Sequence, residues 1–184
     1  MRGYFGIGVE GVSKAMNVGN LLRSAHAFQA SFVFTVAAAY PAAEGGLADT
    51  SNAPNEVPFY SFDSVETLML PKGCATVGVE LDDRAVDLPS FRHPRRAAYV
   101  LGMERGSLSE EMMSCCDHVV RIPTRFSLNL AVAGAIVMYD RLISLQRFGA
   151  RPVVPGGPAE ILPPHVFGEP VWKKKQSRRK GVSA

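Results

Sequence analysis

The chain has 184 residues, enough for one domain with a substantial core and too few for two comfortable ones. Hydrophobic residues make up 47% and charged residues 20% of the chain, as in ordinary soluble globular proteins. The longest apolar run, Leu128–Tyr139, is far shorter than the roughly 20 residues that a membrane span needs, so we expect no membrane partner.

The three cysteines, two of them adjacent, form neither a disulfide framework nor a zinc-binding pattern. The N-terminal residues lack the apolar segment and cleavage site of a secretory signal. We therefore expect a cytoplasmic protein without a bound metal.

In chain order, short apolar runs alternate with helical periodicities. The predicted strands are 4–9, 31–37, 75–79, 97–101 and 118–122. The predicted helices are 17–28 with Asn17 as its N-cap, 63–70, 108–116, and a long apolar one over 127–146 with Ser127 as its N-cap. Residues 41–58 are expected to form a surface loop. This alternation predicts an α/β fold with a mainly parallel sheet flanked by helices.

The first glycine motif, at residues 6–11, fits the GxGxxG fingerprint of nicotinamide-binding proteins. That fingerprint needs a helix that opens at its last glycine and a carboxylate about 20 residues further on. Here the predicted helix opens near Asn17, and residues 28–34 contain no carboxylate. A nicotinamide-dependent oxidoreductase is thus a weak alternative.

Three further patterns could carry chemistry. Arg23 lies opposite the apolar stripe of its predicted helix. Its guanidinium either binds a phosphate or a developing oxyanion, or belongs to an ordinary surface arginine. Residues 101–108 join a buried strand to a helix, at the edge where open α/β sheets bind ligands. Asn129, in an apolar helix, needs a hydrogen-bonding partner, which is either a ligand, an inserted chain segment or nearby backbone.

Charge and composition change near residue 150. Residues 1–150 carry 13 Lys+Arg against 15 Asp+Glu, whereas residues 151–184 carry 7 against 2. Prolines are dense after Gly149, which predicts a domain over 1–149 and a proline-rich, basic C-terminal tail over 150–184. This tail either binds RNA phosphates or is merely solvated. Its candidate RNA contacts are Lys173, Lys174, Lys175, Arg178 and Arg179.

Three motifs follow one another along the chain: Asn-x-Gly-x-x-x-Arg at 17–23, Gly-x-Glu at 102–104, and Ile-Pro at 122–123 followed by Ser-Leu-Asn-x-x-x-Ala at 127–133. Together they resemble the signature motifs of the SpoU (TrmH-like) family. These are RNA ribose 2′-O-methyltransferases of the SPOUT superfamily. The resemblance covers about residues 4–146. Two features depart from the family pattern: Ser107 stands where glycine is usual, and the stretch before Ser127 is short.

The resemblance implies a deep C-terminal trefoil knot, a homodimer, and S-adenosylmethionine as the cofactor. The cofactor-binding positions would be Val79, Gly102, Ile122, Ser127 and Leu128. The catalytic motif positions would be Asn17, Arg23, Glu104, Ser127 and Asn129. Arg23 would be supplied across the dimer interface to the cofactor bound by the partner. We expect it to stabilise the alkoxide and to clamp the RNA phosphate, because a guanidinium stays protonated, and the group that accepts the proton stays open.

We therefore expect methylation of a ribose 2′-hydroxyl, in transfer RNA or, as a close second, in ribosomal RNA. The alternative is a non-catalytic RNA-binding protein of the same fold. No RNA-binding domain is expected before Tyr4, so the dimer surface and perhaps the tail would recognise the RNA.

Overall fold

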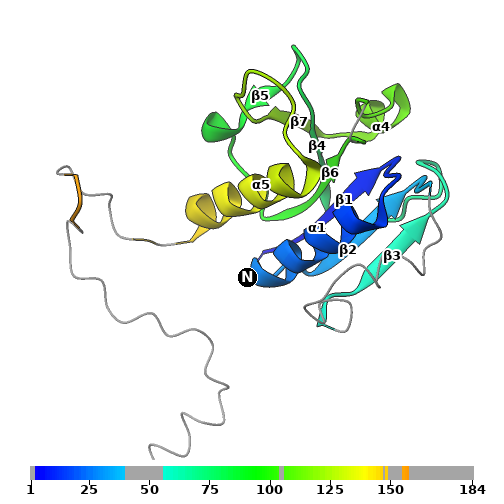
Figure 1. Cartoon of the computed structure of the whole chain (residues 1–184), viewed down its shortest axis with the longest axis horizontal. Coiled ribbons are helices and arrows are strands. Elements are labelled where there is room, and N and C mark those ends of the chain that lie inside the picture. The colour runs from blue at the N-terminus through cyan, green and yellow to red at the C-terminus, as the bar shows by residue number, and fades with distance from the viewer. Residues whose placement is uncertain (1–2, 40–55, 104–105, 147, 149–154, 158–184) are drawn as a thin grey trace, which may run out of the picture. The chain divides into compact units, whose positions relative to one another are not determined.

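The computed structural model describes residues 3–39, 56–103, 106–146, 148 and 155–157 (Figure 1). The chain divides into two units, Met1–Gln146 and Arg147–Ala184, and every described helix and strand belongs to the first. Most of the loop expected over 41–58 and all the basic residues of the tail lie outside the described residues. The predicted boundary at residue 149 stays a prediction.

Within the described residues, seven parallel strands form one sheet, in the order β3-β2-β1-β6-β4-β7-β5. The strands are β1 (Tyr4–Glu10), β2 (Phe32–Val36), β3 (Phe59–Phe62), β4 (Ala75–Val79), β5 (Val86–Asp87), β6 (Arg96–Leu101) and β7 (His118–Arg121). The predicted α/β class with a mainly parallel sheet is confirmed. The trefoil knot stays a prediction.

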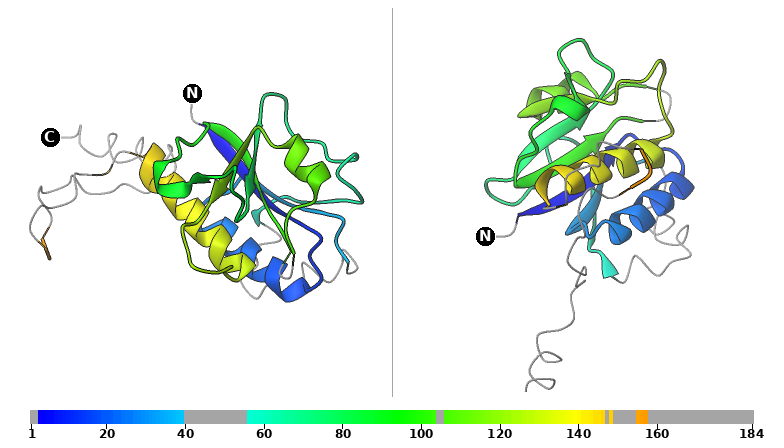
Figure 2. Two further views of the ribbon diagram at one scale, coloured as in Figure 1. Left: turned by 90° about the horizontal axis from the view of Figure 1, so that it is seen from above. Right: turned by 90° about the vertical axis from the view of Figure 1, so that its left-hand side faces the viewer.

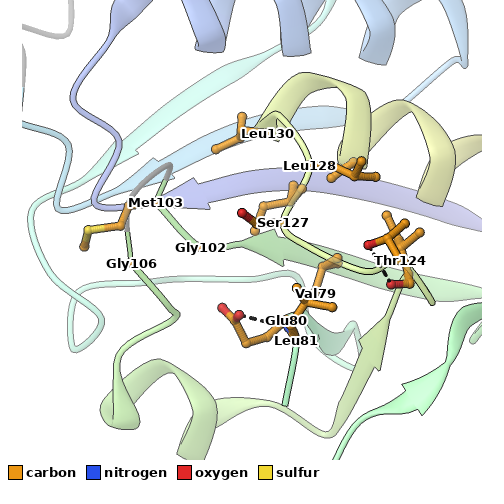
Figure 3. Close-up of a pocket in the computed structure, with 13 residues that line it drawn as sticks. Val79, Glu80, Leu81, Gly102, Met103, Gly106, Thr124, Ser127, Leu128 and Leu130 are labelled. Carbon is orange, nitrogen blue, oxygen red and sulfur yellow. Dashed lines mark hydrogen bonds between the residues drawn. The ribbon is translucent and has the colours of Figure 1, made fainter.

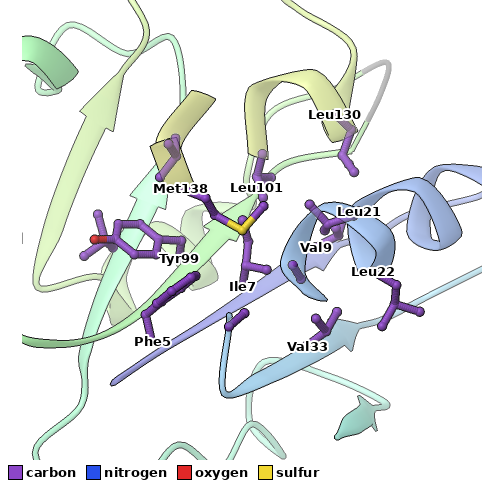
Figure 4. Close-up of a cluster of buried hydrophobic side chains, with 14 of the residues drawn as sticks. Phe5, Ile7, Val9, Leu21, Leu22, Val33, Tyr99, Leu101, Leu130 and Met138 are labelled. Atoms are coloured by element: carbon purple, nitrogen blue, oxygen red, sulfur yellow. The ribbon is translucent and has the colours of Figure 1, made fainter. Parts of the chain in front are cut away.

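Helices cover both faces of this sheet (Figure 2). On one face, α1 (Ala15–Ala27) and α5 (Leu130–Leu145) lie side by side, and α4 (Glu110–Cys115) packs on the other. Because successive strand residues point to opposite faces, Tyr99 and Leu101 pack beneath α5 whereas Val100 packs toward α4 (Figure 4). The core is therefore two apolar layers separated by the sheet.

Glycines allow the closest approaches within these layers. A Cβ atom at Gly6 or Gly8 would overlap the rings of Phe32 and Phe34 on the neighbouring strand. A Cβ atom at Gly134 would likewise overlap Leu21, where α5 crosses α1. The first two glycines of the GxGxxG pattern thus have a packing role within β1, and α1 begins only at Ala15.

A buried polar network ties the second half of α5 to the sheet. The Arg141 guanidinium is buried and donates to the carbonyl oxygens of Tyr4, Pro94 and Arg95, and to the Tyr99 hydroxyl. The same hydroxyl lies 2.6 Å from Nδ1 of His93, whose Nε2 lies 2.9 Å from the Asp140 carboxylate. Burial lowers the pKa of His93 and raises the pKa of Tyr99.

Most predicted elements are present, with three corrections. Residues 63–70 form no helix, because Thr67 bonds back to Ser64 through its backbone amide and its hydroxyl and closes a tight turn instead. Asn17 is not an N-cap, since α1 begins two residues before it and Lys14 precedes the helix. The long helix begins at Leu130, so Ser127 does not cap it. The short strands β3 and β5 were not predicted.

Candidate functional site

A cavity opens at the carboxyl ends of β4, β6 and β7, against the first turn of α5 (Figure 3). Its volume is about 200 Å³, or about 790 Å³ when the open solvent at its mouth is counted. Its lining residues are Val79, Glu80, Leu81, Leu101, Gly102, Met103, Gly106, Ile122, Thr124, Ser127, Leu128, Leu130 and Ala133. A largely apolar wall with a few polar groups is typical of a small-molecule site.

The five predicted cofactor positions all line this one cavity: Val79, Gly102, Ile122, Ser127 and Leu128. They come from three strand ends and from the loop that enters α5. Residues up to 49 positions apart in the sequence therefore converge, because carboxyl ends of parallel strands meet at one edge of the sheet.

Gly102 leaves room where the backbone approaches itself. A Cβ atom at this position would lie 2.9 Å from the Leu108 nitrogen and 3.0 Å from Oε2 of Glu80. Any side chain there would push the returning backbone at 107–108 out of place. Glycine at 102 thus shapes the cavity wall.

Two carboxylates anchor this returning backbone. Oε2 of Glu80 accepts a hydrogen bond from the Leu108 amide at 2.9 Å. Glu10, only 6% exposed, accepts bonds from the next residue, at 2.9 Å from the Ser109 amide and 2.5 Å from its hydroxyl. The Ser109 hydroxyl in turn caps α4 by accepting from the Met112 amide. The wall of the cavity is therefore held at two adjacent residues.

The loop between β7 and α5 forms the opposite wall. The Thr124 hydroxyl lies 3.3 Å from the Ile122 carbonyl oxygen and 2.9 Å from that of Phe126, which closes the short loop on itself. Asn129 ends the loop as the N-cap of α5, because its Oδ1 accepts a hydrogen bond from the Ala131 amide at 3.0 Å. Asn129 is exposed, so its partner is nearby backbone and no buried amide has to be explained.

Arg23 lies in a second hollow, a groove between α1 and α5. The groove is lined by Asn20, Arg23, Ser24, Phe28, Asn129, Ala131, Val132, Ala135, Ile136 and Tyr139. Two large side chains on its α5 wall are exposed, Val132 by 50% and Tyr139 by 53%. Among the described residues, nothing covers this face of the long apolar helix.

The predicted catalytic positions are thus not gathered in one place. Arg23 and Asn129 line the groove, whereas Ser127 lines the cavity. Asn17 is half-buried in the first turn of α1. Glu104 lies outside the described residues, as do the five basic residues of the tail.

Sequence reasoning missed Glu80, the one ionisable side chain among the described residues that line the cavity. Its position directly after the buried strand 75–79 was a usable signal, since residues at strand carboxyl ends face the ligand edge of an open sheet. In the described part of the chain, no cluster of three or more histidine, cysteine or acidic residues could hold a metal ion. No helix there is both long and apolar enough to cross a membrane.

Comparisons with known proteins concern the family and the fold. Residues 5–139 match the sequence model of the SpoU rRNA Methylase family. A search of curated proteins found no match.

Three solved structures share the fold. The SpoU methyltransferase AviRb from Streptomyces viridochromogenes has a TM-score of 0.67 at 19% identity, over 76% of this chain and 59% of its own. An AdoMet-bound rRNA methyltransferase from Sinorhizobium meliloti has a TM-score of 0.70 at 23% identity, over 80% of this chain and 59% of its own. A protein described under "Structural insights into the 2-OH methylation of C/U34 on tRNA" has a TM-score of 0.66 at 22% identity, over 79% of this chain and 98% of its own. This chain thus spans about three fifths of the length of the first two.

Proposed function

The chain belongs to the SpoU rRNA Methylase family, and from that membership we propose that it transfers a methyl group from S-adenosylmethionine to a ribose 2′-hydroxyl in RNA. One observation carries the proposal: the five positions that match the family's cofactor-binding motifs line a single cavity. The AdoMet-bound Sinorhizobium meliloti structure, which shares the fold, supports the same cofactor.

The lining of the cavity fits S-adenosylmethionine in chemistry. Apolar side chains such as Ile122 and Leu128 suit the adenine ring, and the Ser127 and Thr124 hydroxyls offer polar partners. The missing Cβ atom at Gly102 leaves the strand end open to close approach. When bound, the cofactor would supply an activated methyl group.

The residues of the chain would position the ribose and stabilise charge. A 2′-hydroxyl is a weak acid, so the reaction needs an aligned acceptor and a cation near the developing alkoxide. Arg23 supplies a guanidinium cation whose N–H groups can donate to alkoxide or phosphate oxygens. Asn17, in the first turn of the same helix, would orient Arg23 or the ribose.

A homodimer would bring Arg23 to a cavity that it does not line within its own chain. The groove around Arg23 includes the exposed side chains of Val132 and Tyr139 on α5, an apolar face that a second copy could cover. In a symmetric dimer the same face meets itself, so each Arg23 would reach the partner's cavity. The family resemblance supports this arrangement.

We propose transfer RNA as the first substrate to test and ribosomal RNA as the second. The relative whose structure concerns methylation of C/U34 on tRNA is matched over 98% of its length. The family's own description names rRNA, which keeps the second substrate open.

Changing Gly102 to valine should abolish binding of S-adenosylmethionine, because the added side chain displaces the backbone at 107–108. The added side chain meets the backbone at Leu108 and fills the wall of the cavity. Titration calorimetry of wild type should show saturable binding of S-adenosylmethionine and none of NAD, and the variant should show neither. Gly157→Val, where an added Cβ atom meets nothing within 4 Å, is the matched control. If wild type binds no S-adenosylmethionine, the result favours a non-catalytic RNA-binding protein. If it binds NAD alone, the result favours the oxidoreductase.

Removing residues 150–184 should weaken RNA binding and flatten its dependence on salt, without changing cofactor affinity. The five basic side chains at 173–179 would release counterions from phosphates, so their loss lowers the slope of log Kd against log salt concentration. Filter binding of RNA at several salt concentrations measures this slope. Equal slopes for the full and shortened chains would show that the tail is only solvated.

A further inference from the structure

Glu80 holds a fixed carboxylate in the wall of the cavity (Figure 3). Its Oε1 accepts a hydrogen bond from the Leu81 amide and its Oε2 from the Leu108 amide, each at 2.9 Å. Oε2 also lies 3.0 Å from the place where a Cβ atom of Gly102 would stand. Two backbone donors therefore hold the negative charge between the ends of β4 and β6.

No cationic side chain balances this carboxylate among the described residues that line the cavity. The other described lining residues are apolar, glycine, or bear a hydroxyl. The surface next to the cavity mouth carries Asp82, Asp83 and Asp87, of which Asp82 pairs with Arg84 at 2.8 Å and Asp87 pairs with Arg121 at 2.6 Å. A charge in such a wall acts on a ligand more strongly than one in open water.

The returning backbone does not depend on Glu80 alone. Glu10 binds both the amide and the hydroxyl of Ser109, the residue after Leu108. Glu10 would therefore hold this backbone in part even without Glu80. The property that only Glu80 brings to the cavity lining is its negative charge.

We propose that Glu80 makes the cavity selective for a positively charged methyl donor over its neutral product, an inference that rests on the proposed function. S-adenosylmethionine carries a sulfonium cation. On methyl transfer the carbon–sulfur bond breaks, its electron pair stays on sulfur, and the product S-adenosylhomocysteine is an uncharged thioether at that position. The carboxylate attracts the donor through the charge on sulfur, an attraction that the product has lost, so the product leaves more readily.

Calorimetry with three ligands tests the charge directly. The ligands are S-adenosylmethionine, S-adenosylhomocysteine, and sinefungin, which carries an ammonium group in place of the methylated sulfonium. Glu80→Gln should weaken the two cationic ligands at least about fivefold and change the affinity for S-adenosylhomocysteine less than about twofold. Glu80→Asp keeps the charge and should keep the wild-type ratio of the three dissociation constants.

Asp83→Asn is the matched control, because it removes the same charge beside the mouth of the cavity but not from its lining. It should leave the ratio of dissociation constants unchanged. Equal weakening of all three ligands in Glu80→Gln would overturn the proposal in favour of a tether or a bond to the ribose. Unchanged affinity for all three ligands would overturn it as well. If wild type bound none of the ligands, the proposed function itself would fail, an outcome distinct from binding without selectivity.

Discussion

Replacing Arg141 with methionine should lower the free energy of unfolding by about 3 kcal/mol or more, because it leaves buried acceptors without a donor. The guanidinium donates to three backbone carbonyl groups, those of Tyr4, Pro94 and Arg95, and to the Tyr99 hydroxyl. It also lies 5.1 Å from the ring centroid of Phe5. Methionine keeps much of the apolar stem but none of the donors.

Urea denaturation followed by circular dichroism measures this change. Arg84→Met is the matched control, since that side chain is 61% exposed and pairs with Asp82 at the surface. Exposed pairs of this kind contribute little to stability, because water and salt screen the two charges. If Arg141→Met and Arg84→Met lower the free energy of unfolding equally, the buried network does not hold α5 to the sheet.

Replacing Arg23 with alanine should lower the rate of methyl transfer by about 10²- to 10³-fold while S-adenosylmethionine binds as before. The side chain is exposed and lines the groove between α1 and α5, so its loss leaves the core and the cavity intact. Single-turnover assays measure the rate, and calorimetry measures cofactor affinity. Arg92→Ala, which also removes an exposed arginine, should leave both unchanged.

Mixing two inactive variants tests whether Arg23 acts on the partner's cavity. Arg23→Ala keeps an intact cavity, and Gly102→Val keeps an intact arginine. In a symmetric dimer that exchanges subunits, random mixing should restore about a quarter of wild-type activity, because each mixed dimer contains one complete site. If subunit exchange is demonstrated and activity does not recover, Arg23 acts on the cavity of its own chain.

Motif spacing predicted the cavity better than local pattern predicted the boundaries of elements. Val79, Ile122 and Leu128 have no chemical signature of their own, and only the family resemblance placed them together. Both Ser127 and Asn129 are good N-cap residues, and the loop geometry that selects Asn129 depends on packing that local sequence does not encode. The resemblance therefore predicted positions, and tertiary structure decided their local roles.

Three other features could not be predicted, because neither the charge of a residue nor its helix propensity shows whether it is buried. Arg141, near the end of a long helix, has the sequence pattern of a solvent-facing residue, yet it is 5% exposed. A lone acid such as Glu80 belongs to no motif and is recognisable only once the strand ends are seen to converge. The segment at 63–70 has helical periodicity, but Ser64 and Thr67 bond locally to form a turn.

The most direct test of the account is the chemical position of the transferred methyl group. Unmodified transfer RNA and ribosomal RNA are incubated with the protein and S-adenosylmethionine labelled in its methyl group. The RNA is then digested to nucleosides and analysed by mass spectrometry. We expect a labelled 2′-O-methylnucleoside that carries the label on its ribose fragment. The Gly102→Val variant should produce no labelled nucleoside. Label on a base, or no label in either RNA although the cofactor binds, would contradict it.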